Sequence, residues 1–331
     1  MRTKILQLLR EHRGQYLSGE EISQRLGVSR TAIWKHMQAL KQQGYKIESH
    51  SRLGYCLWEA PDRLLPLEIG ARLTTKFIGQ DIYYYDEVDS TNNTAKKLAA
   101  EGCAAGTIVV AESQNTGRGR LSRGWFSPSG KGIWLSVVLR PPFSPQDAPK
   151  CTLLTAVAVN EAIRNVAKLN SSIKWPNDIL YQGKKLVGIL TEMSAEMDSI
   201  NYIVIGVGVN VNIERADFPP ELADIATSLS IETGHKISRM ELLIAILERL
   251  EHYYLLAINE GFAPVFAAWR SMSVTLGQQV DVFGFKRKFT GVALDIDDDG
   301  ALLVQTAEGV ERVLAGDVSI RPAKAGSGFD A

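Results

Sequence analysis

The chain has 331 residues, of which 45% are hydrophobic and 22% charged, the balance of a globular protein rather than of a disordered or fibrous one. Its 37 basic and 37 acidic side chains cancel, yet residues 1–60 carry ten basic side chains against five acidic ones, so a basic segment lies at the N-terminus. No apolar run approaches the ~20 residues that span a bilayer, and the three widely spaced cysteines lack metal-ligand or redox spacing, so we expect a cytoplasmic protein with no membrane segment.

Three helices are predicted at the N-terminus. Apolar residues fall on one side of a helix over residues 2–13. Ser18 begins a capping box and a second helix that ends at Gly27, and Ser29 can cap a third helix that runs to about Gln43. The second and third helices form a helix-turn-helix at about residues 19–38.

Two short strands, 45–48 and 55–58, follow as a wing, so residues 1–60 read as a winged helix-turn-helix domain. A three-helix module used for dimerisation has the same pattern, but the basic excess favours duplex DNA. The exposed face of the third helix contains the candidate DNA-binding residues Arg30, Thr31, Trp34, Lys35 and Gln38.

Residues 67–270 are predicted to form a second, α+β domain. A helix is expected over 67–78 after a proline-containing linker. Strands and helices then follow without strict alternation, which indicates a mixed sheet. The expected strands are 107–112, 133–139, 186–193 and 202–211, and the main helices are 93–101, 148–169 and 239–259.

Residues 272–322 change to short alternating strands separated by tight turns. About fifty residues suffice for a small five-stranded barrel, which we expect to support or bind rather than catalyse. Its expected strands are 279–282, 288–294, 301–306 and 311–314.

A glycine-arginine loop is the strongest sign of chemistry. Gly117-Arg118-Gly119-Arg120 is followed by Arg123 and Trp125, and no acidic residue lies between Glu112 and Asp147. Guanidinium groups match carboxylate and phosphate oxygens, and glycine lets a backbone approach a ligand closely. The pattern indicates an anion site, although an ordinary surface loop has the same composition.

Other polar segments have two readings each. Ser90, Thr91 and Asn92 either cap the next helix or, with Gln114, bind a polar head group. Lys174-Trp175-Pro176-Asn177-Asp178 is a turn or a display of amide and carboxylate. Lys185 is a solvated lysine or a phosphate ligand, and Asn210 ends a glycine-rich strand that is either packed or leaves room for a purine ring.

Several familiar chemistries are disfavoured. The five histidines and three cysteines form no zinc-ligand spacing, so no protein-held metal is predicted. Neither a G-x-S-x-G elbow nor a Walker loop occurs. Cations, an amide and a carboxylate without a nucleophile point to electrostatic catalysis.

Taken together, these motifs resemble the biotin protein ligases in order and spacing. With the helix-turn-helix, the resemblance covers essentially the whole chain and is specifically to the bifunctional members that also repress the biotin operon. The motifs are Asp89-Ser90-Thr91-Asn92, Gln114, Gly117-Arg118-Gly119-Arg120, Trp125-Phe126-Ser127-Pro128, Lys174-Trp175-Pro176-Asn177-Asp178, Lys185-Leu186-Val187-Gly188-Ile189 and Gly206-Val207-Gly208-Val209-Asn210.

The resemblance implies a catalytic domain akin to class II aminoacyl-tRNA synthetases and an SH3-like C-terminal barrel. It implies that biotin and MgATP give biotinyl-5′-adenylate, which biotinylates one lysine of a biotin carboxyl carrier protein, the reaction of a biotin–[acetyl-CoA-carboxylase] ligase. The resemblance further implies that the adenylate acts as corepressor and promotes a homodimer that binds operator DNA. After Arg120 this chain has Leu121-Ser122-Arg123-Gly124, where many members of that family carry another glycine before the arginine and a basic residue before the tryptophan.

Residue roles are implied in the same way. Ser90, Thr91 and Gln114, with Asn92 adjacent, match biotin head-group contacts. The implied catalytic residues are Arg118, Arg120, Lys185 and Asp178, and the implied ligand-binding set adds Gly119, Arg123, Trp125, Asn177 and Asn210.

Two other functions remain open. A lipoate or octanoate ligase would share the central fold, but it gives no reason for the N-terminal module. A ligand-sensing repressor without catalysis would keep that module, but it gives no reason to retain Arg118, Arg120 and Lys185 together.

Overall fold

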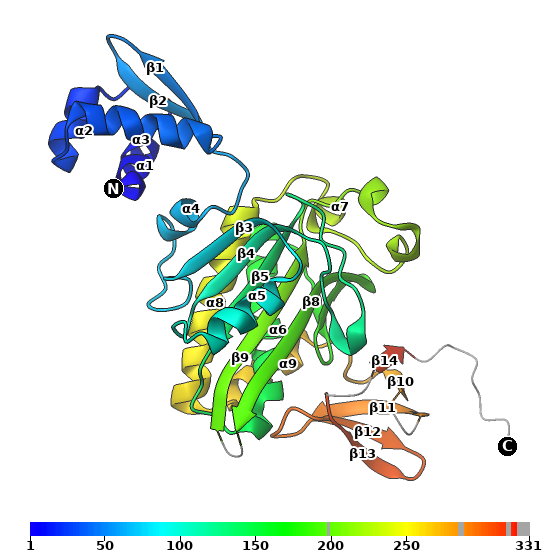
Figure 1. Ribbon diagram of the computed structural model, residues 1–331. Helices are drawn as coiled ribbons and strands as arrows, with labels where there is room; N and C mark the ends of the chain where they lie inside the picture. The colour runs from blue at the N-terminus through cyan, green and yellow to red at the C-terminus, as the bar shows by residue number, and fades with distance from the viewer. Residues whose placement is uncertain (197–198, 284–287, 316–318, 323–331) are drawn as a thin grey trace. The chain divides into compact units, whose positions relative to one another are not determined.

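The computed structural model describes residues 1–196, 199–283, 288–315 and 319–322. Contacts between Cα atoms divide the chain into two units, residues 1–73 and residues 74–331. Figure 1 shows the elements of both.

The first unit is the expected winged helix-turn-helix. Ser18 and Ser29 each accept a hydrogen bond from the backbone of the following helix, at Glu21 and Ala32, which confirms both caps. The three helices bury Ile5, Ile22, Ile33, Met37 and Leu40, among others, in one core. The elements are α1 (Arg2–Glu11), α2 (Gly19–Leu26), α3 (Arg30–Gln42), the antiparallel pair β1 (Lys46–His50) and β2 (Gly54–Glu59), and α4 (Pro66–Gly70).

The helix expected over 67–78 is wrong beyond Gly70, where α4 ends. In the second unit, the backbone N–H groups of Lys76, Phe77 and Ile78 donate instead to the buried carboxylate of Glu251, at 2.6, 2.9 and 3.0 Å. Glu251 belongs to α8 (Arg239–Glu260). A carboxylate far away in sequence thus replaces helical hydrogen bonds, which local periodicity could not predict.

A seven-stranded mixed sheet dominates the second unit, as expected. Its order is β3-β4-β5-β9-β8-β7-β6, in which only β3 and β4 pair in parallel. The strands are β3 (Ile82–Val88), β4 (Ile108–Gln114), β5 (Gly132–Leu139), β6 (Ser172–Lys174), β7 (Asp178–Tyr181), β8 (Lys184–Glu196) and β9 (Ser199–Asn210).

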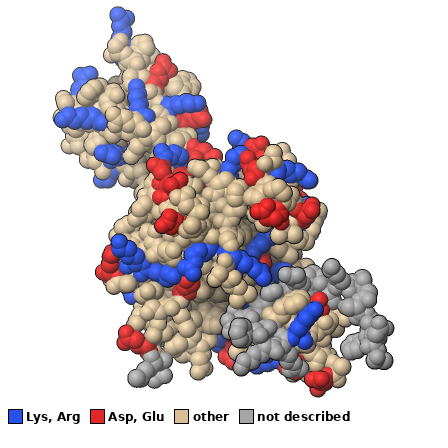
Figure 2. Space-filling model, turned by 45° about the vertical axis from the view of Figure 1, so that its right-hand side comes forward, with Lys and Arg blue, Asp and Glu red and all other residues tan. Residues whose placement is uncertain are grey.

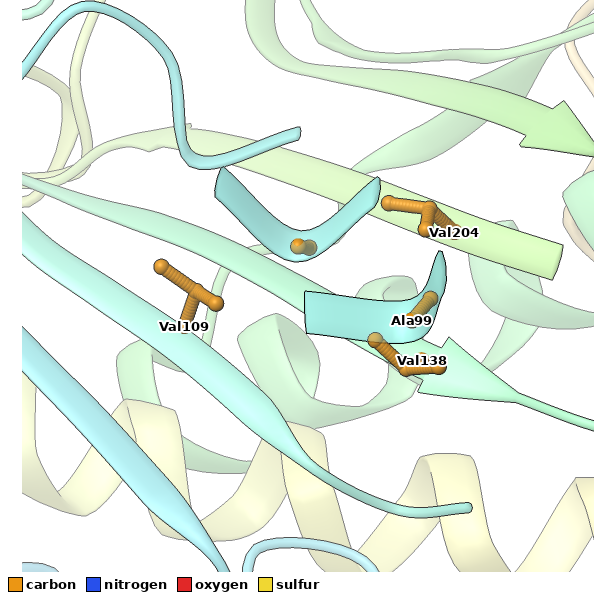
Figure 3. Close-up of a cluster of buried hydrophobic side chains, with 5 residues drawn as sticks. Ala99, Val109, Val138 and Val204 are labelled. Carbon is orange, nitrogen blue, oxygen red and sulfur yellow. The ribbon is translucent and has the colours of Figure 1, made fainter. Parts of the chain in front are cut away.

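Helices cover both faces of this sheet. The long helix α6 (Ala148–Ala167) packs on one face together with α8 and α9 (Ala263–Met272). On the opposite face α5 (Thr91–Ala100) brings two alanines against valines of β4, β5 and β9, so the helix lies close to the strands (Figure 3). Shorter segments are α7 (Leu229–Thr233) and 3₁₀ turns at Arg120–Ser122, Pro145–Asp147, Arg215–Asp217 and Pro220–Leu222.

A separate antiparallel sheet follows, in the order β13-β12-β11-β10-β14. It contains the four strands expected from the sequence and a fifth: β10 (Gln279–Phe283), β11 (Lys288–Ile296), β12 (Leu302–Thr306), β13 (Gly309–Val313) and β14 (Ser319–Pro322). Within the predicted range 272–322, residues 284–287 and 316–318 lie outside the described residues.

No helix in the described part of the chain is long and apolar enough to cross a membrane. All three cysteines are free thiols.

Candidate active site

A cavity of about 690 Å³ opens on the face of the central sheet that carries α5. The N-terminus of α5, the ends of β4, β8 and β9, and the loops at 117–126 and 174–178 line it. All thirteen active-site candidates from the sequence are among its lining residues: Ser90, Thr91, Asn92, Gln114, Arg118, Gly119, Arg120, Arg123, Trp125, Asn177, Asp178, Lys185 and Asn210.

A network of neutral polar groups occupies one end of the cavity. Gln114 Oε1 accepts from the backbone N–H of Thr91 at 2.9 Å and from its hydroxyl at 3.1 Å. Gln114 Nε2 donates to Ser127 Oγ at 2.8 Å. Ser90 is the N-cap residue of α5, but its side chain makes no capping hydrogen bond. Because Gln114 supplies the acceptor at this helix terminus, capping does not account for the Ser90 and Thr91 side chains.

Asn92 is held by groups that sequence reasoning missed. Its Oδ1 lies 2.6 Å from Ser136 Oγ, and its Nδ2 donates to Glu192 Oε2 at 2.9 Å. Glu192 Oε1 also accepts from Lys96 Nζ at 2.8 Å and lies 3.6 Å from Arg118 Nη1. Burial acts to raise the pKa of Glu192, but the hydrogen bonds from Lys96 and Asn92 outweigh it and leave that pKa below its ordinary value.

The loop arginines diverge along the cavity. Arg118 Nη1 donates to Asn93 Oδ1 at 2.9 Å, whereas Arg120 donates to Asn177 Oδ1 at 3.0 Å and to the carbonyl of Ala315. The next two residues, Leu121 and Ser122, have φ values of 55° and 57°. A left-handed backbone costs a non-glycine residue about 1–2 kcal/mol. Leu121 and Ser122, which replace part of the glycine-containing pattern of the family, therefore hold a strained backbone conformation that a glycine would adopt without cost.

At the other end of the cavity, a lysine and a carboxylate are paired. Lys185 Nζ lies 2.6 Å from Asp178 Oδ1 and 5.2 Å from the centre of the Trp125 ring. Asn177 Nδ2 donates to the carbonyl of Ile189 at 2.8 Å, which fixes the side chain that Arg120 contacts. The structure therefore brings the 174–178 segment, Lys185 and the arginine loop to one place.

Asn210 and Trp125 lie differently from the sequence interpretation. Asn210 Nδ2 donates to the carbonyl of Thr227 at 3.0 Å, so its amide nitrogen holds a loop. A hydrogen bond from Asn210 to a purine base stays a prediction. The room that the strand glycines leave for a ring is occupied by the indole of Trp125 itself, over Gly188 and Gly208.

The candidate DNA-binding residues lie on α3 in the first unit. Arg30, Thr31, Trp34 and Lys35 are exposed and Gln38 is half-buried, opposite the buried Ile33, Met37 and Leu40. Figure 2 shows lysine and arginine side chains over the visible face of this unit, with fewer acidic ones among them. The face predicted from helical periodicity is therefore free to meet a partner, while its DNA contacts stay a prediction.

Comparisons with known proteins agree with this architecture. Residues 84–210 match the Biotin/lipoate A/B protein ligase family, residues 2–56 an HTH domain, and residues 275–321 the Biotin protein ligase C terminal domain. The bifunctional ligase/repressor BirA of Bacillus subtilis is 43% identical over 97% of this chain and 98% of its own length. The Escherichia coli protein of the same name is 30% identical over 97% of each chain.

A solved structure extends the similarity to three dimensions. Biotin protein ligase from Aquifex aeolicus, in complex with biotin and ATP, has a TM-score of 0.65 and 31% identity and covers 74% of this chain and 100% of its own. Fold and cavity thus define a protein ligase domain of the biotin/lipoate class. The chain belongs to the biotin protein ligase family, among the bifunctional ligase/repressors.

Proposed function

We propose that this protein is an ATP-dependent biotin protein ligase that forms biotinyl-5′-AMP, transfers biotin to a lysine of a biotin carboxyl carrier protein, and represses a biotin operon. One observation carries the enzymatic part. In the described part of the chain the cavity is lined by five basic residues (Arg118, Arg120, Arg123, Lys174 and Lys185) and one acidic residue, Asp178. Two anions can therefore meet there at reduced repulsion.

The first step joins a carboxylate to a phosphate. A biotin carboxylate oxygen attacks the α-phosphorus of ATP, the bond to the β-phosphate breaks, and pyrophosphate leaves. Arg118, Arg120 and Lys185 offset the charge that builds up on the phosphoryl oxygens. A preorganised donor at such a site contributes about 10²- to 10³-fold in rate.

The second step uses the mixed anhydride. The neutral ε-amine of the acceptor lysine attacks the biotinyl carbonyl carbon, loses a proton, and expels AMP. We assign the orientation of that amine to Asp178, the acidic residue of the cavity lining, which is paired with Lys185. Closure of the arginine loop would keep water from the anhydride.

The neutral end of the cavity suits the biotin head group. Ser90, Thr91 and Gln114 offer hydroxyl and amide groups held by one another and by Ser127. Asn92, which also lines the cavity, is joined to Thr91 through the hydroxyl group of Ser136. Such groups match an uncharged ureido ring better than a second anion.

Magnesium fits this site only as a companion of the nucleotide. The described residues contain no group of three or more His, Cys, Asp or Glu side chains that could hold a metal ion. Mg²⁺ commonly binds through one or two carboxylates plus substrate phosphates, and Asp178 would be that carboxylate here. Bound in this way, the ion supplies neutralising charge to the phosphates.

Regulation is the second part of the proposal. Biotinyl-5′-AMP would order the arginine loop and promote a homodimer, which presents two α3 helices to a palindromic operator. Three free thiols and the cytosolic substrates ATP and carrier protein suit a cytoplasmic location.

Mass spectrometry of a carrier domain incubated with the protein, biotin and MgATP tests the ligase. One added biotin, absent without ATP, is the expected result. Lipoate or octanoate added in excess should not replace biotin, and their attachment would favour the related ligase instead. No added mass together with biotin-dependent operator binding would identify a ligand-sensing repressor without catalysis.

A further inference from the structure

Three glycines leave bare backbone on the floor of the cavity. Gly206 and Gly208 lie two residues apart on β9, so both face the same side of the sheet. Gly188 on β8 pairs directly with Gly208. The intervening Val207 points its side chain to the opposite face. A methyl group at any of these three positions would therefore project into the cavity.

The Gly188–Gly208 pair carries the indole of Trp125. A Cβ atom on Gly208 would lie 2.3 Å from Nε1 and 2.6 Å from Cε2 of that indole. On Gly188 it would lie 2.7 Å from Cζ3. Each half of the indole thus rests on one strand, closer than any side chain would allow.

Gly206 carries a different side chain. A Cβ atom there would lie 2.2 Å from Oδ1 and 2.9 Å from Cγ of Asn92. Asn92 cannot move aside freely, because its Nδ2 donates to the carbonyl of Leu190 at 3.2 Å and to Glu192 at 2.9 Å. A methyl group at this position must therefore displace the amide from its network.

The two seated side chains belong to different halves of the cavity. Asn92 adjoins Thr91 and shares Ser136 with it, at the neutral end. Trp125 lies under the ammonium group of Lys185, at the charged end. The indole Nε1 is buried against the Gly208 backbone and has no hydrogen-bond partner among the described residues.

We propose that the three glycines are positioning residues for different substrates. Gly206 provides the space that holds Asn92 in place in the biotin half of the site. Gly208 and Gly188 provide the space that holds Trp125, and through it Lys185, in place in the nucleotide half. This assignment rests on the proposed function. It predicts that the same glycine-to-alanine substitution, made at two positions two residues apart on one strand, changes the KM for different substrates.

Steady-state kinetics with G206A and G208A tests the division, and each variant is the control for the other. G208A and G188A should raise KM for ATP on the order of tenfold, since a displacement of about 1 Å in a site can cost that much or more, and leave KM for biotin unchanged. G206A should do the reverse. Equal effects on both substrates in either variant would overturn the proposal.

Thermal unfolding tests the packing of Trp125 on Gly208 by a measurement that does not depend on enzyme activity. G208A should lower Tm in the wild-type background but much less in a W125A background, where space is free. G206A should lower Tm equally in both backgrounds. If G208A lowered Tm equally in both backgrounds, the packing of Trp125 on Gly208 would be refuted. The same conclusion would follow if W125A folded but W125A/G208A did not. An inactive wild type would instead contradict only the proposed function.

Discussion

Arg118 is the loop residue for which the proposed role in holding a ligand anion gives the most direct test. Its guanidinium donates to Asn93 and lies near Glu192, so the loop is tied to α5 through an exchangeable contact. Arg118→Gly should loosen retention of the adenylate and allow biotin to reach lysines of unrelated proteins. A mixed-protein acceptor assay, with Arg215→Gly as an exposed control outside the cavity lining, measures this. Unaltered specificity would refute the role of Arg118.

Glu192 is the residue whose charge holds this arrangement together. Its lowered pKa means that the ionised form stabilises the fold above the ordinary value of 4.5, and that this contribution is lost as the pH falls through the lower value in the folded chain. Glu192→Gln should lower the stability by roughly 0.5–1 kcal/mol near neutral pH, the usual value for a partly exposed pair. Thermal unfolding of both proteins should show a difference in Tm that shrinks below about pH 4.5. A difference that does not depend on pH would contradict the ion-pair role.

At the scale of an element, α3 presents basic side chains in one direction because Ile33, Met37 and Leu40 are buried on the other. If Arg30 and Lys35 each contact a DNA phosphate, replacing either by alanine should reduce the salt slope of operator binding by about one unit. Lys4→Ala, an exposed lysine of α1, serves as the control. An unchanged slope in both α3 variants would exclude these phosphate contacts.

Across the second unit as a whole, Trp175 links the catalytic sheet to the C-terminal sheet. Its indole N–H donates to the carbonyl of Gly300 at 3.1 Å, and its backbone N–H donates to Thr275 Oγ1 at 2.9 Å. The same segment presents Asn177 and Asp178 to the cavity. Docking of the C-terminal sheet and placement of these two residues are therefore mechanically connected.

Trp175→Phe should cost about 1–3 kcal/mol, because it leaves the Gly300 carbonyl buried without its donor. Hydrogen exchange should then increase in β11 and β12, and KM for ATP should rise. Trp269→Phe is a matched control, since Trp269 is fully buried but its indole nitrogen has no hydrogen-bond partner in the described part of the chain. Equal effects of the two substitutions would show that the loss of ring volume, and not the loss of the hydrogen bond to Gly300, causes the destabilisation.

Much of this could be predicted because the signals are local. Ser18 and Ser29 begin helices as expected, since a cap needs only the next three residues. Glu192 could not be identified as part of the site, because it lies beyond the motif that begins β8 and meets Asn92 only across the folded sheet. The helix expected past Gly70 was wrong for a similar reason, namely the competing carboxylate of Glu251.

The sequence by itself determined the winged helix-turn-helix and the mixed sheet, since periodicity and caps are properties of neighbouring residues. The resemblance of its ordered motifs to the biotin protein ligases gave thirteen of the residues that line one cavity. Only the tertiary structure decided which side chains meet. It placed the indole of Trp125 on Gly188 and Gly208, turned the Asn210 amide toward a loop, and made Trp175 a link between sheets. Such contacts join segments up to 125 positions apart in the chain, and their geometry depends on how the whole core packs.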